Sequence, residues 1–209
     1  LCYVIIIIIT IYYVLFPPAK VELNNNMKVA LLSFWFPEYC ILLANALSKK
    51  VESYLFLPDR HIQYYDTCIS STVRRVPYNL PRMRSLLPSM CMLGKLFRQL
   101  DAHSPSLVHL QAGYPWFNLI MPYVHKKYPF VTTVHDIDTH PGDKESEKFF
   151  FRDMAIRYSD RFIVHGNQLK QAFTMKYKIP HERVDIINHG VYSIYCSYAR
   201  ERVEEEEPY

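Results

Sequence analysis

The chain has 209 residues, of which 50% are hydrophobic and 21% charged, so it can bury a core, and disorder of the whole chain is excluded. The net charge of +4 is small and scattered, which argues against a nucleic-acid partner, because such proteins concentrate Lys and Arg in one stripe. Five widely spaced Cys without a CxxC pair favour free thiols in a reducing cytosol over a disulfide framework or a zinc site.

Residues 1–26 differ in composition from the rest of the chain. Leu1 to Phe16 are almost all apolar, and Lys20 and a run of three Asn follow. The run is short for a transmembrane helix, which needs about 20 apolar residues, and it lacks the basic start and the cleavage site of a signal peptide. A translated AT-rich stretch upstream of Met27 would give the same residues. We therefore expect residues 1–26 to be an upstream artefact or a membrane anchor, and the domain to begin at Met27.

From Met27 to about Cys196, short apolar runs alternate with amphipathic segments. Strands are predicted over 28–34, 51–57, 107–110, 130–134, 161–164 and 184–187, with a further short strand over 72–76. Helices are predicted over 38–50, 82–102, 116–127, 144–158 and 168–176, and Pro88 is expected to break or restart the second of these. This alternation predicts an α/β fold of the Rossmann-like, doubly wound type, with a mostly parallel sheet covered by helices on both faces.

In a doubly wound sheet, ligands bind at the loops that leave the carboxyl ends of the strands. The loop after the first strand, residues 34–38, contains no Gly. A dinucleotide-binding turn needs Gly there, because only Gly lets the backbone approach a pyrophosphate. The loop therefore excludes an NAD or FAD enzyme of that type, and the chain also has no GxxxxGK[ST] phosphate-binding loop.

The densest polar cluster follows the predicted strand 130–134, where His135 and Asp136 are candidate catalytic residues. A neutral imidazole can bind a sugar hydroxyl or orient a reacting group, and the carboxylate can fix its tautomer. The alternative is a loop His that bonds to local backbone. Asp138 and His140 extend the cluster to a set that could ligate Zn or Mn, as would a metal-dependent hydrolase. Against a shared metal, adjacent residues on an extended strand point to opposite faces, so we expect no metal site.

Two further His-Gly pairs follow predicted strands, His165-Gly166 and His189-Gly190. With His135 they would all lie at one edge of a parallel sheet, which indicates a common cleft. The competing interpretation is local: Asn167 would cap the next helix, and Gly190 would form a plain turn at positive φ.

Five segments carry a resemblance to a known family: "MKVALLSFWFP", "LVHLQ", "FVTTVHDIDTHPG", "SDRFIVHGNQLKQAF" and "YKIPHERVDIINHGV". Together they resemble the N-terminal half of a family 4, GT-B type glycosyltransferase, over about residues 27–196. The resemblance implies one of two Rossmann-like domains that face each other across a cleft. It implies that this half binds a glycan or lipid-linked acceptor and that the second domain binds a nucleotide diphosphate sugar, which is a co-substrate and the only cofactor-like molecule needed.

The resemblance also implies roles for particular residues. His135, with Asp136 beside it, would lie near the donor sugar and the reaction centre, and transfer would retain the anomeric configuration without metal. The other residues expected to contact substrate lie at strand ends: Phe36, Pro37, Gln111, His165, Gly166, His189 and Gly190. Phe36 and Pro37 stand where the family often has a Gly-Gly turn close to the donor phosphates, so a phosphate contact from this loop is not expected.

The C-terminal end is a charge run, residues 197–209, which resembles an acidic linker toward a missing C-terminal domain. The Glu-x7-Glu motif expected in that domain does not occur in the chain, so we expect the chain alone to be inactive. Besides the metal-dependent hydrolase, a non-catalytic membrane-anchored binding domain is an alternative. Residues 74–98 interleave six Lys or Arg with apolar residues, which predicts peripheral contact with an anionic membrane, and we expect a cytoplasmic location at the inner face of a membrane.

Overall fold

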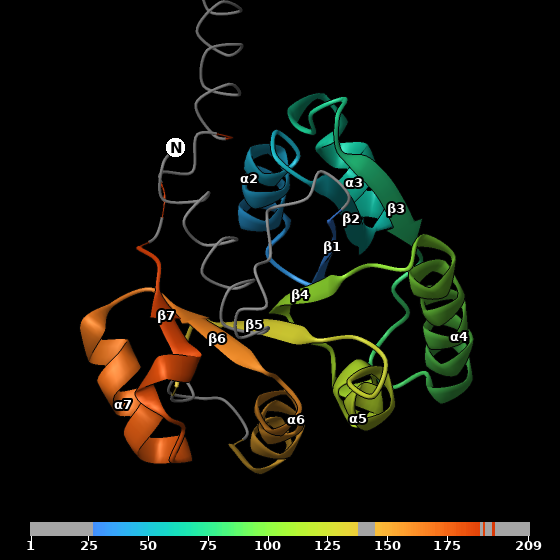
Figure 1. Cartoon of the computed structure of the whole chain (residues 1–209). Coiled ribbons are helices and arrows are strands. Elements are labelled where there is room, and N and C mark those ends of the chain that lie inside the picture. The colour runs from blue at the N-terminus through green and yellow to red at the C-terminus, as the bar shows by residue number, and fades with distance from the viewer. Residues whose placement is uncertain (1–26, 138–144, 189, 191–193, 195–209) are drawn as a thin grey trace, which may run out of the picture.

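The computed structural model describes residues 27–137, 145–188, 190 and 194. Within them, seven strands form one parallel sheet in the order β3-β2-β1-β4-β5-β6-β7 (Figure 1). The strands are β1 (Lys28–Ser33), β2 (Glu52–Pro58), β3 (Arg74–Tyr78), β4 (Leu107–Ala112), β5 (Phe130–Val134), β6 (Arg161–Val164) and β7 (Val184–Ile186). The strand order reverses direction between β1 and β4, which is the switch point of a doubly wound sheet.

Helices cover both faces of this sheet, which confirms the Rossmann-like prediction (Figure 1). They are α2 (Pro37–Leu47), α3 (Asp59–Tyr64), α4 (Leu86–His103), α5 (Pro115–Val124), α6 (Glu145–Arg157) and α7 (Asn167–Tyr177). The core beneath α2 and α3 is separate from the core beneath α4 and α5, so the two sets pack on opposite faces.

Successive side chains along each strand point to opposite faces of the sheet and so pack in different cores. Val29 and Leu31 of β1 pack in the core with α2, whereas Ala30 and Leu32 pack with α4 and α5. All four side chains are almost fully buried, which is why a central parallel strand reads as a continuous apolar run.

Two elements differ from the sequence predictions. The helix predicted from residue 82 begins at Leu86, and Pro88 lies in its first turn, where a missing backbone N–H costs little, so the proline does not break it. The short helix α3 was not predicted, because its six residues bury only Ile62 and so give no apolar stripe.

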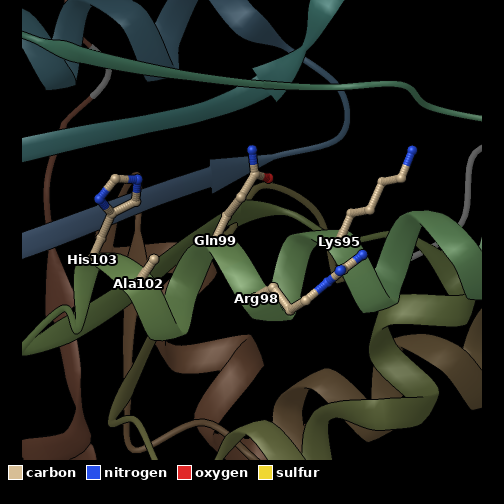
Figure 2. A pocket seen from close by; sticks show the side chains of 5 residues that line it. All are labelled: Lys95, Arg98, Gln99, Ala102 and His103. Atoms are coloured by element: carbon tan, nitrogen blue, oxygen red, sulfur yellow. The ribbon is translucent and has the colours of Figure 1, made fainter.

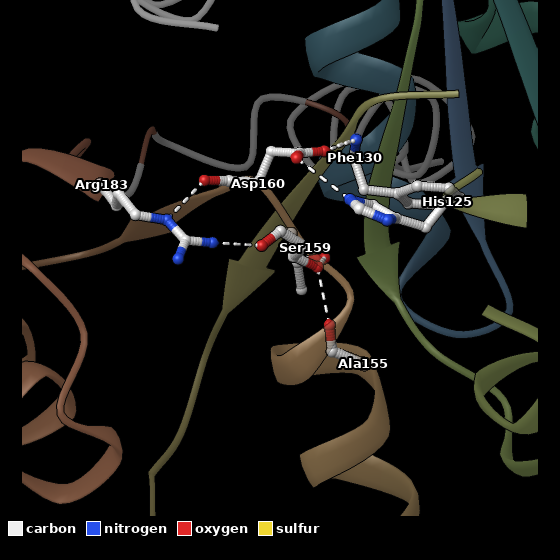
Figure 3. Close-up of polar contacts among 7 residues, drawn as sticks. His125, Phe130, Ala155, Ser159, Asp160 and Arg183 are labelled. Carbon is white, nitrogen blue, oxygen red and sulfur yellow. Dashed lines mark hydrogen bonds and ion pairs between the residues drawn. The ribbon is translucent and has the colours of Figure 1, made fainter. Parts of the chain in front are cut away.

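The amino ends of three strands are tied together by the turn between α6 and β6 (Figure 3). One Asp160 carboxylate oxygen accepts from the Phe130 backbone N–H at 2.7 Å, and the other lies 3.0 Å from His125 Nε2. Arg183, just before β7, donates from Nε to the Asp160 carbonyl at 2.8 Å. These contacts fix β5, β6 and β7 relative to one another at the edge opposite the predicted site.

Candidate functional site

Polar side chains from three adjacent strands gather on the α2 face of the sheet. Because side chains alternate along a strand, His109 and Gln111 of β4 share this face with Leu107, and Thr133 and the following His135 share it with Val131. The register pairs Leu110 with Thr132 and Val134 with Val164. The residues that follow these pairs are therefore neighbours as well: Gln111 lies next to Thr133, and His135 lies next to His165.

His135 lies at the centre of this group and is half-buried. Its Nε2 atom is 3.0 Å from Gln111 Nε2 and 3.2 Å from the Gln111 carbonyl oxygen. Aromatic rings flank it: the ring centroids of Phe36, Tyr39 and His165 lie 5.6, 6.3 and 5.1 Å from that of His135. The ring is thus held by polar contacts on one edge and enclosed by aromatic rings around it.

A β-bulge lies beside this ring. Along β1 and β4, Leu32 pairs with Leu110 but Ser33 pairs with Ala112, so Gln111 is an extra residue in the ladder. A bulged residue leaves the regular pairing and re-aims its groups, and bulges are common next to active sites. Here the carbonyl of Gln111 contacts His135.

The loop after β1 has the backbone conformation that Gly usually adopts, although it contains none. Phe36 precedes the first residue of α2 with φ 54° and ψ 60°, in the left-handed region. Its side chain is 59% exposed and lies against the His135 ring, whereas Pro37 is buried at the first position of the helix. The large ring of Phe36 stands where a Gly-Gly turn would leave open space.

His165 connects the cluster to the last strand. Its Nδ1 lies 2.9 Å from the Ile187 carbonyl oxygen, and because a carbonyl only accepts, Nδ1 carries a hydrogen. Gly166 occupies the position that precedes α7 and Asn167 is already helical, so the expected Asn167 cap is wrong. Gly190 is exposed, and a Cβ added there would meet no other atom within 4 Å.

The other predicted site residues are placed as follows. Asp136 follows His135 and is exposed, and Gly166 follows His165. Asp138, His140 and His189 lie outside the described residues. Among the residues that are described, no three His, Cys, Asp or Glu side chains come close enough to hold a metal ion, and the metal-dependent hydrolase finds no support.

The structure adds three residues that the sequence predictions missed: Tyr39, Thr133 and His109. Tyr39 contacts both the His135 and the His165 ring. His109 and Thr133 are buried beneath Gln111 and joined to each other at 2.8 Å. Their signal in the sequence is a spacing of two, His109 with Gln111 and Thr133 with His135, which places each pair on one face of a strand.

A second surface feature lies over α4, away from His135. Figure 2 shows Lys95, Gln99 and His103 pointing toward the same side of the helix, where they line a shallow hollow of about 340 Å³ with Arg98 and Ala102. At the start of the helix, Leu87 is 76% exposed, with Met83, Leu86 and Met90 also exposed. Met92, Leu93 and Leu96, which the sequence also suggested for a membrane face, are instead buried in the core.

No helix in the described part of the chain has both the length and the apolarity to cross a membrane. The apolar run Leu1 to Phe16 lies outside the described residues.

The family described as Glycosyltransferase Family 4 matches residues 38–192, which is most of the chain. No curated protein matches the sequence.

Solved structures share the fold at low sequence identity. A glycosyltransferase from Rickettsia africae is 14% identical with a TM-score of 0.56, and covers 87% of this chain and 48% of its own. UDP-N-acetylglucosamine 2-epimerase from Rickettsia bellii is 11% identical with a TM-score of 0.63, over 87% of this chain and 50% of its own. Anabaena HepE, solved with UDP and glucose, is 14% identical with a TM-score of 0.55, over 79% and 45%. The chain thus spans about half the length of these structures and has the architecture of one half of a GT-B fold.

Proposed function

The chain belongs to glycosyltransferase family 4, and we propose that it is the acceptor-binding half of an enzyme that transfers a sugar from a nucleotide diphosphate sugar to a glycan or lipid-linked acceptor. The proposal depends most on one observation. His135 stands at the carboxyl end of β5, with Gln111 on one edge and the rings of Phe36, Tyr39 and His165 around it. Aromatic faces and a positioned imidazole suit a sugar, which has apolar C–H faces and hydroxyl edges.

In the proposed reaction, His135 binds a sugar hydroxyl at the reaction centre, and the exposed Asp136 beside it accepts from a further hydroxyl. The His165 imidazole supports the His135 ring from the next strand. A second domain would hold the donor diphosphate and stabilise the leaving group electrostatically, with retention of configuration. The Anabaena relative was solved with UDP and glucose, which supports a uridine diphosphate sugar as the donor class.

The loop after β1 would shape the acceptor side of this cleft. Phe36 closes the space over His135, and Glu38 places an acidic residue in the first turn of α2. A carboxylate there disfavours a phosphate at this helix N-terminus. The donor diphosphate would therefore depend on groups of the second domain more than on this loop.

We also propose peripheral contact of the α4 end with an anionic membrane. Exposed Leu87 and Met90 closely follow the exposed Arg82 and Arg84 in the chain, and the exposed Lys95 and Arg98 come later in the same helix. Apolar residues would enter the interface while each well-placed cation adds about 1 kcal/mol toward anionic headgroups. This contact would present a lipid-linked acceptor to the cleft, and it is consistent with a cytoplasmic location at the inner face of the membrane.

Sugar transfer by a completed enzyme tests the central proposal. The full chain is joined to the C-terminal domain of the Rickettsia africae glycosyltransferase, and consumption of UDP-sugars is measured with glycan and lipid-linked acceptors. The control is the Rickettsia africae enzyme with its own N-terminal half, joined to the same C-terminal domain at the same position. Transfer by the joined protein and none by the chain alone is the expected result. No transfer by the joined protein, beside an active control, would overturn the proposal.

Flotation with liposomes tests the membrane contact. The full chain with Leu87→Ser and Met90→Ser should lose the part of its flotation that depends on anionic lipid. Met175→Ser is the matched control, since that side chain is 79% exposed on α7. Equal flotation of the double variant and the control would show that this end of α4 does not bind lipid.

A further inference from the structure

A continuous chain of polar contacts leads from the core to His135. His109 Nε2 lies 2.8 Å from Thr133 Oγ1, which lies 3.0 Å from Gln111 Oε1. Gln111 Nε2 in turn lies 3.0 Å from His135 Nε2. His109, Thr133 and Gln111 are 3%, 6% and 1% exposed, so little water competes for these groups. Buried polar groups pair with one another, and the direction of each hydrogen bond constrains the next.

The main-chain carbonyl of Gln111 decides the direction of this chain. It lies 3.2 Å from His135 Nε2 and can only accept, so this contact requires a hydrogen on Nε2. An Nε2–H cannot also accept from the Gln111 side chain. A half-turn of the carboxamide exchanges its oxygen and nitrogen at the same positions, and the side chain then accepts from His135 as well. The backbone carbonyl has no such freedom.

With the carboxamide in that orientation, the remaining groups pair in order. The Gln111 amide nitrogen donates to Thr133 Oγ1, and the Thr133 hydroxyl donates to His109 Nε2. Each contact then has one donor and one acceptor. We propose that Gln111, Thr133 and His109 are positioning residues that hold His135 as the tautomer with its hydrogen on Nε2, which makes Nδ1 the acceptor atom of the ring.

The state of His109 fits this direction. Burial, and to a lesser extent the charge that His135 can carry, lower the pKa of His109 to about 3. His109 is therefore neutral near pH 7 and can present a bare Nε2 to the Thr133 hydroxyl. A charged His109 would donate from Nε2 and force the chain to run the other way.

The catalytic consequence rests on the proposed function. A ring fixed in one tautomer keeps the same nitrogen as donor and the same nitrogen as acceptor, which suits a group that must hold one orientation at the reaction centre. The tautomer itself does not depend on that function. It is a property of the chain that can be measured without substrate.

Nitrogen NMR of the histidine rings measures the tautomers directly. The full chain is labelled with ¹⁵N in its histidines, and long-range ¹H–¹⁵N spectra are assigned with His135→Ala and His109→Gln. The expected result is a protonated Nε2 and bare Nδ1 on His135, and the reverse on His109. A hydrogen on Nδ1 of His135 would overturn the proposal.

Substitutions in the chain test the positioning role. Gln111→Met keeps the length of the side chain but removes its contact with the ring, so only the main-chain carbonyl of residue 111 still favours a hydrogen on Nε2, and part of the His135 population should change to the Nδ1–H tautomer. Thr133→Val should make His109 a mixture of both tautomers. Thr132→Val is the matched control, because its hydroxyl bonds to Ser159 on the opposite face of β5, and it should change neither ring. If a folded Gln111→Met leaves His135 entirely in the Nε2–H form, the main-chain carbonyl alone sets the tautomer, and the side chains of Gln111, Thr133 and His109 do not position the ring.

Two variants are used in case one of them does not fold. Either variant tests the positioning role, provided that its backbone NMR spectrum matches that of the wild type. The assay is also separate from turnover. A fixed tautomer in a joined protein that transfers no sugar would count against the proposed function and leave the positioning role intact.

Discussion

The imidazole rings of His135 and His165 lie 5.1 Å apart, at an angle of 41°, although thirty positions separate them in the sequence. They meet because β5 and β6 are parallel neighbours in register, so the residues just past Val134 and Val164 reach the same edge. Tyr39, in the first turns of α2, contacts both rings. One edge of the sheet thus collects titratable and aromatic groups from three separate parts of the chain.

Two glycines should respond to Ala substitution in opposite directions. A Cβ on Gly113 would lie 2.6 Å from Asn118 Oδ1, and the Asn118 side chain is buried and bonded to the Phe151 carbonyl. Gly113→Ala should therefore destabilise the protein by about 1–3 kcal/mol. Gly94, inside α4, has open space around it, so Gly94→Ala should stabilise by up to about 1 kcal/mol. Urea unfolding of both variants measures the difference, and equal effects would contradict this packing.

The left-handed backbone at Phe36 predicts an unusual order of stabilities. Phe36→Gly and Phe36→Ala both remove the contact with the His135 ring, but only Gly adopts φ 54° without strain. We expect Phe36→Gly to be more stable than Phe36→Ala by about 1 kcal/mol in chemical unfolding. An Ala variant as stable as the Gly variant would show that the loop relaxes to an ordinary conformation.

The buried His109 predicts a pH dependence of stability. Its pKa falls from 6.5 to about 3 in the folded protein, so between these values the unfolded chain binds the extra proton. The contribution of His109 to the free energy of unfolding is therefore fully present above about pH 6.5, and it is lost as the pH falls toward 3. From pH 7 to pH 5, the free energy of unfolding of wild type should fall by about 2 kcal/mol relative to His109→Gln. A difference that stays constant with pH would mean that His109 is not buried as a neutral ring.

A buried ion pair joins β6 to β7. Arg161, 3% exposed, donates from Nε and Nη2 to one Asp185 oxygen at 3.1 and 2.7 Å. Asp185→Ala would leave a buried cation without its partner and should cost about 3 kcal/mol. Adding Arg161→Met should recover part of that loss, because the uncompensated charge is then removed. Thermal and urea unfolding compare the variants, and a double variant less stable than Asp185→Ala would contradict this account.

The fold could be predicted largely from the sequence, because parallel strands and their covering helices leave strong local signals. The apolar run of β1 and the β-branched run of β5 are examples, and both strands lie where the sequence placed them. The start of α4 was harder to predict. A proline is tolerated in the first turn of a helix but not further in, so the effect of Pro88 depends on where the helix begins, and the sequence does not show that. Helix α3 has one buried residue and no periodic pattern to detect.

The candidate site was predicted in part. The sequence indicated that His135 and His165 would share an edge, since both follow strands of a parallel sheet, and the structure brings them together. It could not indicate the bulge at Gln111, because a bulge arises from the pairing of two strands and not from either strand alone. Tyr39 was missed for the same kind of reason: its contact with the two rings depends on how α2 packs over the sheet.

The most direct test of the central claim, that His135 acts at the reaction centre, is the turnover of its Ala variant in the joined enzyme. His135→Ala should lower kcat for sugar transfer by about 100-fold or more, while the unfolding temperature changes little, since the ring is only half-buried. His181→Ala is the matched control, because that His is exposed in the turn before β7, at the other end of the strands. It should keep full turnover. Equal kcat values for a folded His135→Ala variant and this control would contradict the account.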